Sequence, residues 1–125
     1  MFKLYCDGAK RNNKLYYGFV IKDDNNQIIK QDGGTIPCNN FSNNFAEYLG
    51  IIFGLIEVIK LGIKKIIVYC DADTMIKQIN GSAKVKSEYM KFGYHFVMFL
   101  SKNFDYIEFM WISRKENKAA DRETR

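Results

Sequence analysis

The first third of the chain alternates apolar and polar residues with the period of two that a β-strand requires. Three segments with this pattern are expected to be strands: Phe2 to Cys6, Leu15 to Lys22 and Gln27 to Gln31. The acidic and amide residues between the second and third segments favour a hairpin turn. Asp7-Gly8 is predicted to be a turn, and Gly33-Gly34 with Pro37 is predicted to end the extended run.

The apolar residues then change to a helical period. The residues that share one face of this helix are Phe45, Leu49, Ile52, Phe53, Ile56 and Ile59. Ser42, Asn43 or Asn44 can cap its start, and Gly62 lies where a C-terminal cap is expected. The pattern therefore predicts one long helix packed on the sheet.

The second half of the chain alternates strands and helices. The nearly continuous apolar run from Lys65 to Cys70 is typical of a buried parallel strand. The elements predicted after it are a short helix capped by Asp73 or Thr74, a helix over Glu88 to Lys102, a strand over Tyr106 to Ile112 and a terminal helix from Glu116. This order indicates an α/β protein whose mixed sheet is covered by helices.

The composition is that of a soluble globular domain. The 125 residues are 47% hydrophobic and 15% aromatic, which excludes intrinsic disorder. The length fits a single domain over residues 1–125. No apolar run approaches the roughly 20 residues of a membrane span, so we expect no membrane association. Three cysteines are too few for a disulfide scaffold and favour a reducing, cytoplasmic compartment.

Four carboxylates lie at the ends of predicted elements: Asp7 and Asp71 after strands, Glu47 and Asp121 early in helices. If the two strands are parallel neighbours, Asp7 and Asp71 emerge at the same carboxyl edge, where α/β sheets bind ligands. Clustered acids repel one another unless a divalent cation offsets their charge, and oxygen-only ligands suit Mg²⁺ or Mn²⁺. Each acid alone also fits an ordinary role in a turn, a capping box, a strand end or a helix start.

The net charge is best interpreted with these four acids counted separately. The net charge of +5 suggests a polyanionic partner such as nucleic acid, although the lysine bias of an AT-rich genome would give the same value. Without the four acids the rest of the chain carries +9. The sequence thus describes a basic body around one acidic site.

Four stretches resemble the sequence blocks of type 1 ribonuclease H, in the family's order and over essentially the whole chain. They are Tyr5-Cys6-Asp7-Gly8-Ala9, Ser42-Asn43-Asn44-Phe45-Ala46-Glu47-Tyr48, Val68-Tyr69-Cys70-Asp71-Ala72-Asp73 and Arg114-Lys115-Glu116-Asn117-Lys118-Ala119-Ala120-Asp121. The chain is similar to the short archaeal and bacterial branch, because only Asn80 to Ser87 separates the two middle helices and the basic protrusion of the longer branch is absent. The resemblance implies a ribonuclease H-like fold: a mixed five-stranded sheet, first three strands antiparallel and then parallel, with helices on both faces.

The resemblance also implies an activity, the hydrolysis of the RNA strand of an RNA–DNA hybrid with two Mg²⁺ ions, for which Mn²⁺ can substitute. Asp7, Glu47, Asp71 and Asp121 match the family's catalytic, metal-binding acids, and Asp7 is expected to be shared between the ions. The residues expected to contact substrate are Gly8, Ala9, Asn13, Ser42, Asn43, Asn44, Lys84, Lys86 and Arg114. Gly8 and Ala9 are expected to let a nucleic-acid strand approach the metals, and duplex RNA is a second candidate partner of the expected monomer.

The chain departs from the family pattern at three places. The family's loop after the first acid is shortened to Lys10-Arg11-Asn12-Asn13-Lys14, so either Asn13 or Asn12 takes the place of the asparagine that the resemblance implies contacts RNA. The family's histidine before the last acid has no counterpart between Trp111 and Asp121; Arg114 is the nearest basic residue and cannot shuttle protons. The chain continues for only one turn after Asp121 and has no apolar residue there, so Asp121 is expected on a frayed end unless the chain is clipped. The only histidine, His95, is interpreted as a packing or surface residue.

Two alternatives to the nuclease remain open: a noncatalytic module that binds hybrid or duplex RNA, and the ribonuclease H domain of a reverse transcriptase. An intact set of four acids favours the enzyme, because a pure binder gains nothing from carboxylates that face phosphates. Asp73 is interpreted as a helix cap and not as a fifth ligand. Strand alternation predicts that the Cys6 and Cys70 thiols lie near each other on the face opposite the carboxylates.

Overall fold

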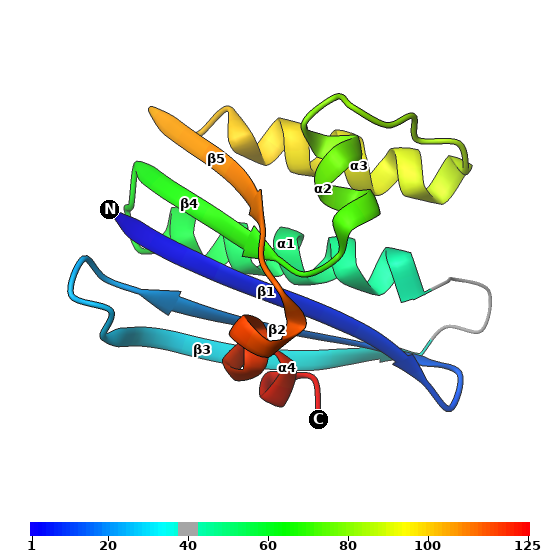
Figure 1. The fold of residues 1–125 in the computed structure, drawn as a ribbon, viewed down its shortest axis with the longest axis horizontal. Helices are drawn as coiled ribbons and strands as arrows, with labels where there is room; N and C mark the ends of the chain where they lie inside the picture. The colour runs from blue at the N-terminus through cyan, green and yellow to red at the C-terminus, as the bar shows by residue number, and fades with distance from the viewer. Residues whose placement is uncertain (38–42) are drawn as a thin grey trace.

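The computed structural model describes residues 1–37 and 43–125, apart from the side chain of Asn43. These residues form one five-stranded sheet with helices on both faces (Figure 1). The strands are β1 (Phe2–Arg11), β2 (Lys14–Lys22), β3 (Ile28–Pro37), β4 (Lys65–Cys70) and β5 (Tyr106–Trp111). The helices are α1 (Asn43–Lys60), α2 (Asp73–Ile79), α3 (Glu88–Ser101), the 3₁₀ helix η1 (Arg114–Asn117) and α4 (Lys118–Glu123).

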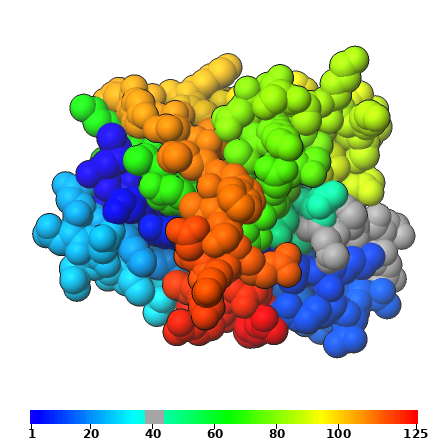
Figure 2. Space-filling model, in the orientation of Figure 1, coloured from blue at the N-terminus to red at the C-terminus, as the bar shows by residue number. Residues whose placement is uncertain are grey.

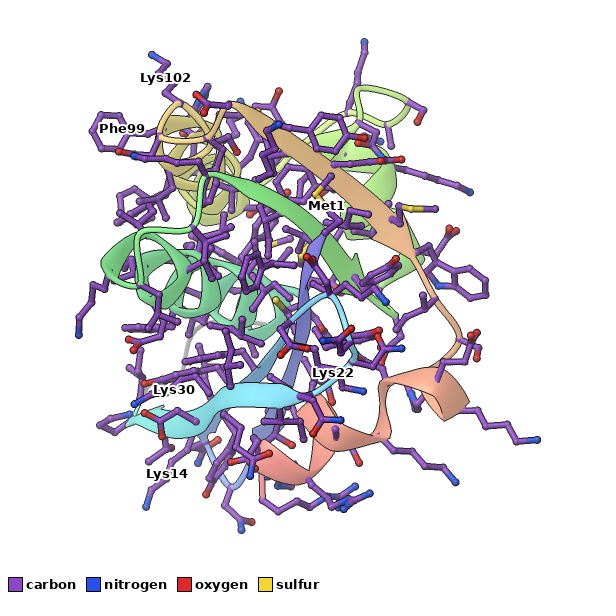
Figure 3. All side chains as sticks on the ribbon, turned by 90° about the vertical axis from the view of Figure 1, so that its left-hand side faces the viewer. Met1, Lys14, Lys22, Lys30, Phe99 and Lys102 are labelled. Carbon is purple, nitrogen blue, oxygen red and sulfur yellow. The ribbon has the colours of Figure 1, made fainter. Side chains whose placement is uncertain are left out.

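The sheet has the order β3-β2-β1-β4-β5. The pairs β1–β2 and β2–β3 are antiparallel, whereas β1–β4 and β4–β5 are parallel. Figure 3 shows α1 and α3 on one side of the sheet and η1 and α4 on the other. The predicted mixed sheet, its strand directions and its two covered faces are therefore confirmed.

The main core lies between the sheet and the helices α1 and α3. Leu4 and Cys6 of β1 alternate toward this side and have no exposed surface, and Ile51 and Leu55 of α1 meet them from the helix. Val97 brings α3 into the same cluster. Among the residues described, no helix combines the length and apolar character needed to cross a membrane.

Strand β1 is longer than the sequence predicts. Asp7-Gly8 is not a turn, because β2 continues to pair with β1 as far as Arg11 opposite Lys14. The turn is instead formed by Asn12 and Asn13, whose φ angles of 51° and 60° are tolerated by asparagine. The parallel pairing of β1 with β4 nevertheless ends one residue before Asp7, so this carboxylate does lie at the carboxyl edge of that ladder.

The glycine pair Gly33-Gly34 does not end β3, which runs through both residues to Pro37. The prediction of a break is wrong because Gly33 serves a tertiary contact. A Cβ atom on Gly33 would lie 1.9 Å from the backbone oxygen of Glu123 in α4. Gly33 thus leaves room for the last helix to lie directly on the sheet.

Helix α4 docks through small residues, so the expectation of a frayed end around Asp121 is wrong. Ala120 is fully buried and Thr124 is 1% exposed. Gly18 of β2 faces the same helix, since a Cβ atom there would lie 2.6 Å from the backbone oxygen of Ala120. Arg11 of β1 also donates a hydrogen bond to the backbone oxygen of Thr124. A search for large apolar residues misses this kind of docking.

We expect Gly33→Ala to lower the free energy of unfolding by about 1–3 kcal/mol, because the added methyl group would collide with the backbone of α4. Gly34→Ala is the matched control, because the atoms nearest to a Cβ there belong to the side chain of Tyr17 and not to a backbone. Urea denaturation measures both variants. Equal stabilities of the two would contradict the assigned contact.

The helix ends follow the sequence with two exceptions. Gly62, with a φ of 77°, closes α1 as predicted, and its amide donates to the carbonyl oxygen of Ile59. Helix α2 begins at Asp73, but its N-cap Ala72 provides no side-chain hydrogen bond. Asp73 instead pairs with Lys77 at 3.0 Å, so its predicted role as a cap is wrong. The terminal helix starts earlier than predicted, as the 3₁₀ helix η1.

Candidate functional site

Three of the four predicted acids converge at the carboxyl edge of β1 and β4. Asp7, Glu47 and Asp71 each offer a carboxylate oxygen, and these oxygens all lie within 4.8 Å of one another. Asp7 comes from β1, Asp71 directly follows β4, and Glu47 comes from the N-terminal part of α1. The sheet register places the first two side by side, and helix packing adds the third.

Gly8 is the reason that α1 can bring Glu47 so close. A Cβ atom on Gly8 would lie 2.2 Å from the backbone carbon and oxygen of Ala46, the residue before Glu47. Gly8 therefore packs against the helix backbone, in addition to lining the cleft described below. Sequence reasoning assigned its small size to the approach of a nucleic-acid strand and missed this strand–helix contact.

Burial and mutual repulsion disfavour the ionised form of these acids. Asp7 is only 6% exposed, and burial, followed by the charge of Asp71, raises its pKa to about 7. Burial, followed by the charges of Asp7 and Asp71, raises the pKa of Glu47 to about 9. Without a counter-charge the group retains protons at neutral pH. A hard divalent cation fits this all-oxygen donor set, because it would offset the repulsion.

Asp121 lies beside the three convergent acids. The guanidinium of Arg125 is 2.9 Å from its Oδ2 atom and is the main cause of the lowered pKa of Asp121. After burial and Asp71, a side-chain hydrogen bond with Asp121 is the next cause of the raised pKa of Asp7. Asp121 is thus next to Asp7, and a basic residue currently neutralises it.

Three of the four acids, Asp7, Glu47 and Asp121, line a cleft with a basic rim. A cavity of about 340 Å³ is lined by Asp7, Gly8, Ala9, Lys10, Arg11, Glu47, Arg114, Asp121 and Arg125. Figure 2 shows the orange-to-red atoms of η1 and α4 beside the blue atoms of the β1–β2 turn. The rim residues Lys10, Arg11 and Arg125 were not predicted, because their contribution depends on strand pairing and on the docking of α4.

The predicted substrate residues fall into three groups. Gly8, Ala9 and Arg114 line the cleft as expected. Residues outside its lining are Asn13 in the β1–β2 turn, Asn44 in the first turn of α1, and Lys84 and Lys86 in the α2–α3 connection, all of them exposed. Ser42 and the side chain of Asn43 lie outside the described residues.

A larger hollow lies at the opposite end of β1. Its volume is about 560 Å³, and its lining includes Met1, Phe2, Leu61 and Ile63. This hollow is mostly apolar; its lining includes Asp24, Lys64 and Lys65, and Asp24 pairs with the amino terminus, but no group of converging acids lines it among the described residues. Chemistry, and not size, therefore identifies the acidic cleft as the candidate functional site.

Asn117 is a buried site residue that no sequence pattern singles out. Its amide nitrogen donates to Oδ2 of Asp71 at 3.0 Å and to the backbone oxygen of Cys6 at 2.7 Å. The only sequence signal was its place in the last of the four blocks. The structure adds it to the surroundings of the acids.

The two cysteines occupy opposite positions of the last β1–β4 register pair, as expected. Both are fully buried, and burial raises the pKa of each thiol. The thiol of Cys70 donates to Oε2 of Glu47 at 3.7 Å. The prediction that the thiols face away from all the carboxylates is thus wrong for Glu47, because this acid comes from α1, which covers the thiol side of the sheet.

Two other polar residues lie away from the site. His95 is exposed on α3, where its ring makes an edge contact with Tyr94. Asp73 is exposed and engaged by Lys77. Neither belongs to the acid cluster, which agrees with their interpretation from the sequence as non-ligands.

Known proteins with the same organisation were found by sequence and by structure. A family model described as reverse transcriptase-like matches residues 5–123. The bifunctional protein Rv2228c of Mycobacterium tuberculosis is 32% identical over 120 residues, which are 94% of this chain but 32% of that protein. This chain therefore spans about a third of the length of the curated relatives it matches.

Solved structures show the same fold. The N-terminal ribonuclease H domain of Rv2228c has a TM-score of 0.91 at 29% identity, with 98% of this chain and 89% of that chain covered. RNase H1 of the halophilic archaeon Halobacterium salinarum has a TM-score of 0.92 at 26% identity, with 97% and 92% covered. LC11-RNase H1, solved with an RNA/DNA hybrid, has a TM-score of 0.89 at 24% identity, with 98% and 92% covered. The chain belongs to the reverse transcriptase-like family and, within it, to type 1 ribonuclease H.

Proposed function

We propose that this chain is an endoribonuclease that hydrolyses the RNA strand of RNA–DNA hybrids with the help of divalent cations. The convergence of Asp7, Glu47 and Asp71 is the observation that supports this function best, and the first two of these acids line a cleft with a basic rim. The hybrid bound to LC11-RNase H1 and the ribonuclease H domain of Rv2228c support the choice of substrate.

Asp7, Glu47, Asp71 and Asp121 would hold the cations, with Asp7 shared between two Mg²⁺ or Mn²⁺ ions. The chemistry that such a pair supplies when bound is activation of a water and stabilisation of the leaving oxygen of a phosphodiester. To bind a cation, the Asp121 carboxylate would have to release the Arg125 guanidinium, because the two side chains are paired. The buried carboxylates supply a preorganised negative site that needs no protein nucleophile.

The basic rim would hold the phosphates that flank the scissile bond. Arg114 and Arg11 line the cleft, and the Arg11 guanidinium is fixed 4.3 Å from the ring centre of Tyr16. An arginine remains protonated at neutral pH, so Arg114 would bind phosphate and would not take over the proton transfer of a histidine. Binding should therefore weaken steeply as salt rises.

Recognition of RNA would use backbone shape and 2′-hydroxyl groups. Asn13 is exposed in the β1–β2 turn, and Asn44 is exposed in the first turn of α1. The family resemblance assigns Ser42 and Asn43 to substrate binding as well. Lys84 and Lys86 would add phosphate contacts from the α2–α3 connection. We propose that residues 1–125 act as one domain and as a monomer.

The test is a cleavage assay with labelled RNA–DNA hybrid, duplex RNA and duplex DNA, each with Mg²⁺, Mn²⁺ or EDTA. We expect the RNA strand of the hybrid to be cut with either cation and not with EDTA. Hybrid that is bound but never cut would identify a noncatalytic binding module instead. Cleavage that persists in EDTA would refute the metal requirement.

A further inference from the structure

Asn117 connects the two strands that carry the acids to the segment that carries Asp121. It is the last residue of η1 and is 1% exposed. Its Nδ2 atom donates to the backbone oxygen of Cys6 at 2.7 Å and to Oδ2 of Asp71 at 3.0 Å. Both partners are acceptors, so they fix which end of the amide is nitrogen.

The Asn117 amide bridges β1 and the end of β4 at the point where the pairing of these two strands stops. Cys6 and Cys70 form the last register pair between β1 and β4, and the acids Asp7 and Asp71 follow them directly. Asn117 binds the backbone of the first strand and the carboxylate that follows the second. Because the Asn117 side chain is buried, its hydrogen bond leaves the Asp71 carboxylate little freedom to rotate.

The oxygen at the other end of the amide, Oδ1, has no hydrogen-bond partner in residues 1–37 and 43–125. Among the residues that the structure describes, Oδ1 of Asn117 is the buried side-chain polar atom without a hydrogen bond. A buried acceptor of this kind is costly and is usually explained by a bound water or ion. Here it belongs to a side chain that already holds one of the converging carboxylates.

We propose that Asn117 is a positioning residue of the metal centre. Its Nδ2 atom holds the Asp71 carboxylate in place as a ligand, and its Oδ1 atom accepts a hydrogen bond from water carried by the bound cation. This inference rests on the metal binding in the proposed function. It assigns to Asn117 the outer-shell role that orients a ligand and tunes its metal affinity.

The test compares Asn117→Ala with Asn80→Ala. Asn80 is a matched control, because its amide also donates to a strand carbonyl, that of Phe109 at 3.0 Å, but contacts no acid of the site. Mn²⁺ alone is titrated into each protein without nucleic acid, and bound Mn²⁺ is followed by electron paramagnetic resonance. Thermal unfolding of the metal-free proteins is measured in parallel.

We expect both variants to unfold at lower temperature, and only Asn117→Ala to bind Mn²⁺ more weakly, by about 10- to 100-fold. If Asn117→Ala does not fold, Asn117→Ser takes its place in the titration. This variant keeps a small polar side chain and should show the same loss of Mn²⁺ affinity. Raised Mn²⁺ should restore hybrid cleavage by the Asn117 variants. Affinity for Mn²⁺ within twofold of the wild type in the Asn117 variants would overturn the proposal.

The same experiment separates this inference from the proposed function. Wild-type protein that binds Mn²⁺ more tightly than its Asn117 variants but cuts no hybrid would refute the nuclease activity and support the positioning role. Wild-type protein that binds no Mn²⁺ would overturn both.

Discussion

Asp7→Asn is expected to abolish cleavage of RNA in an RNA–DNA hybrid and, at the same time, to stabilise the metal-free protein. Asp7 is buried and lies with Glu47 and Asp71 in one cluster of carboxylates. An amide is a poor ligand for a hard cation, so the rate should fall by about 10³-fold or more. The same substitution removes one buried charge from a repelling group, which should raise the free energy of unfolding at pH 8 by about 1–3 kcal/mol.

The two effects are measured by single-turnover cleavage with Mg²⁺ and by urea denaturation in EDTA. Asp73→Asn is the matched control, because Asp73 is exposed, pairs with Lys77 and lies outside the cluster. It should leave the cleavage rate unchanged. An Asp7→Asn protein that retained wild-type activity, or that was destabilised in EDTA, would contradict the arrangement described for the acids.

The stability of the metal-free protein should fall as pH rises from about 4 to about 9. Burial and the neighbouring acids raise the pKa of Asp7 to about 7 and that of Glu47 to about 9, well above the ordinary values of carboxylic acids. The folded state therefore binds more protons than the unfolded state across this range. Each such group can lower the free energy of unfolding by at most about 1.4 kcal/mol per pH unit.

Divalent cations should reverse this trend. Mg²⁺ binds the ionised acids of the folded state and competes with their protons, so its stabilising effect should grow as pH rises through the same window. Urea denaturation from pH 4.5 to 9, with Mg²⁺ or with EDTA, measures both curves. Glu47→Gln should flatten the upper part of the EDTA curve. Parallel curves with and without Mg²⁺ would argue against a cation at the cluster.

The positions of the acids could be predicted because they depend on local pattern. A strand that ends, a helix that begins and a block such as Asn43-Asn44-Phe45-Ala46-Glu47 are all visible in the sequence. If the two strands are parallel neighbours, Asp7 and Asp71 share the carboxyl edge of the sheet. The shared edge of Asp7 and Asp71 remained conditional on strand neighbours, and the strand arrangement and the convergence of three carboxylates came from the resemblance to type 1 ribonuclease H.

The residues that make the site possible could not be predicted in the same way. Gly8 and Gly33 were assigned to a turn and to a strand break, because local rules treat glycine as a flexible residue. Both instead allow two backbones to approach closely, and that depends on partners distant in the chain. The same holds for Asn117, whose amide reaches a strand at the other end of the sequence.

The long-range contacts of the last segment have a consequence for the synthesis of the protein. Asn117 and Cys6 are 111 positions apart, and Arg11 and Thr124 are 113 apart. A chain made from its amino end has β1 available long before η1 and α4 leave the ribosome. Asp7, Glu47 and Asp71 can assemble with the sheet, whereas Asp121 and Asn117 join only afterwards. A nascent chain still without residues 114–125 thus carries an incomplete acidic site, and the full set of acids can come together only after these residues have been made.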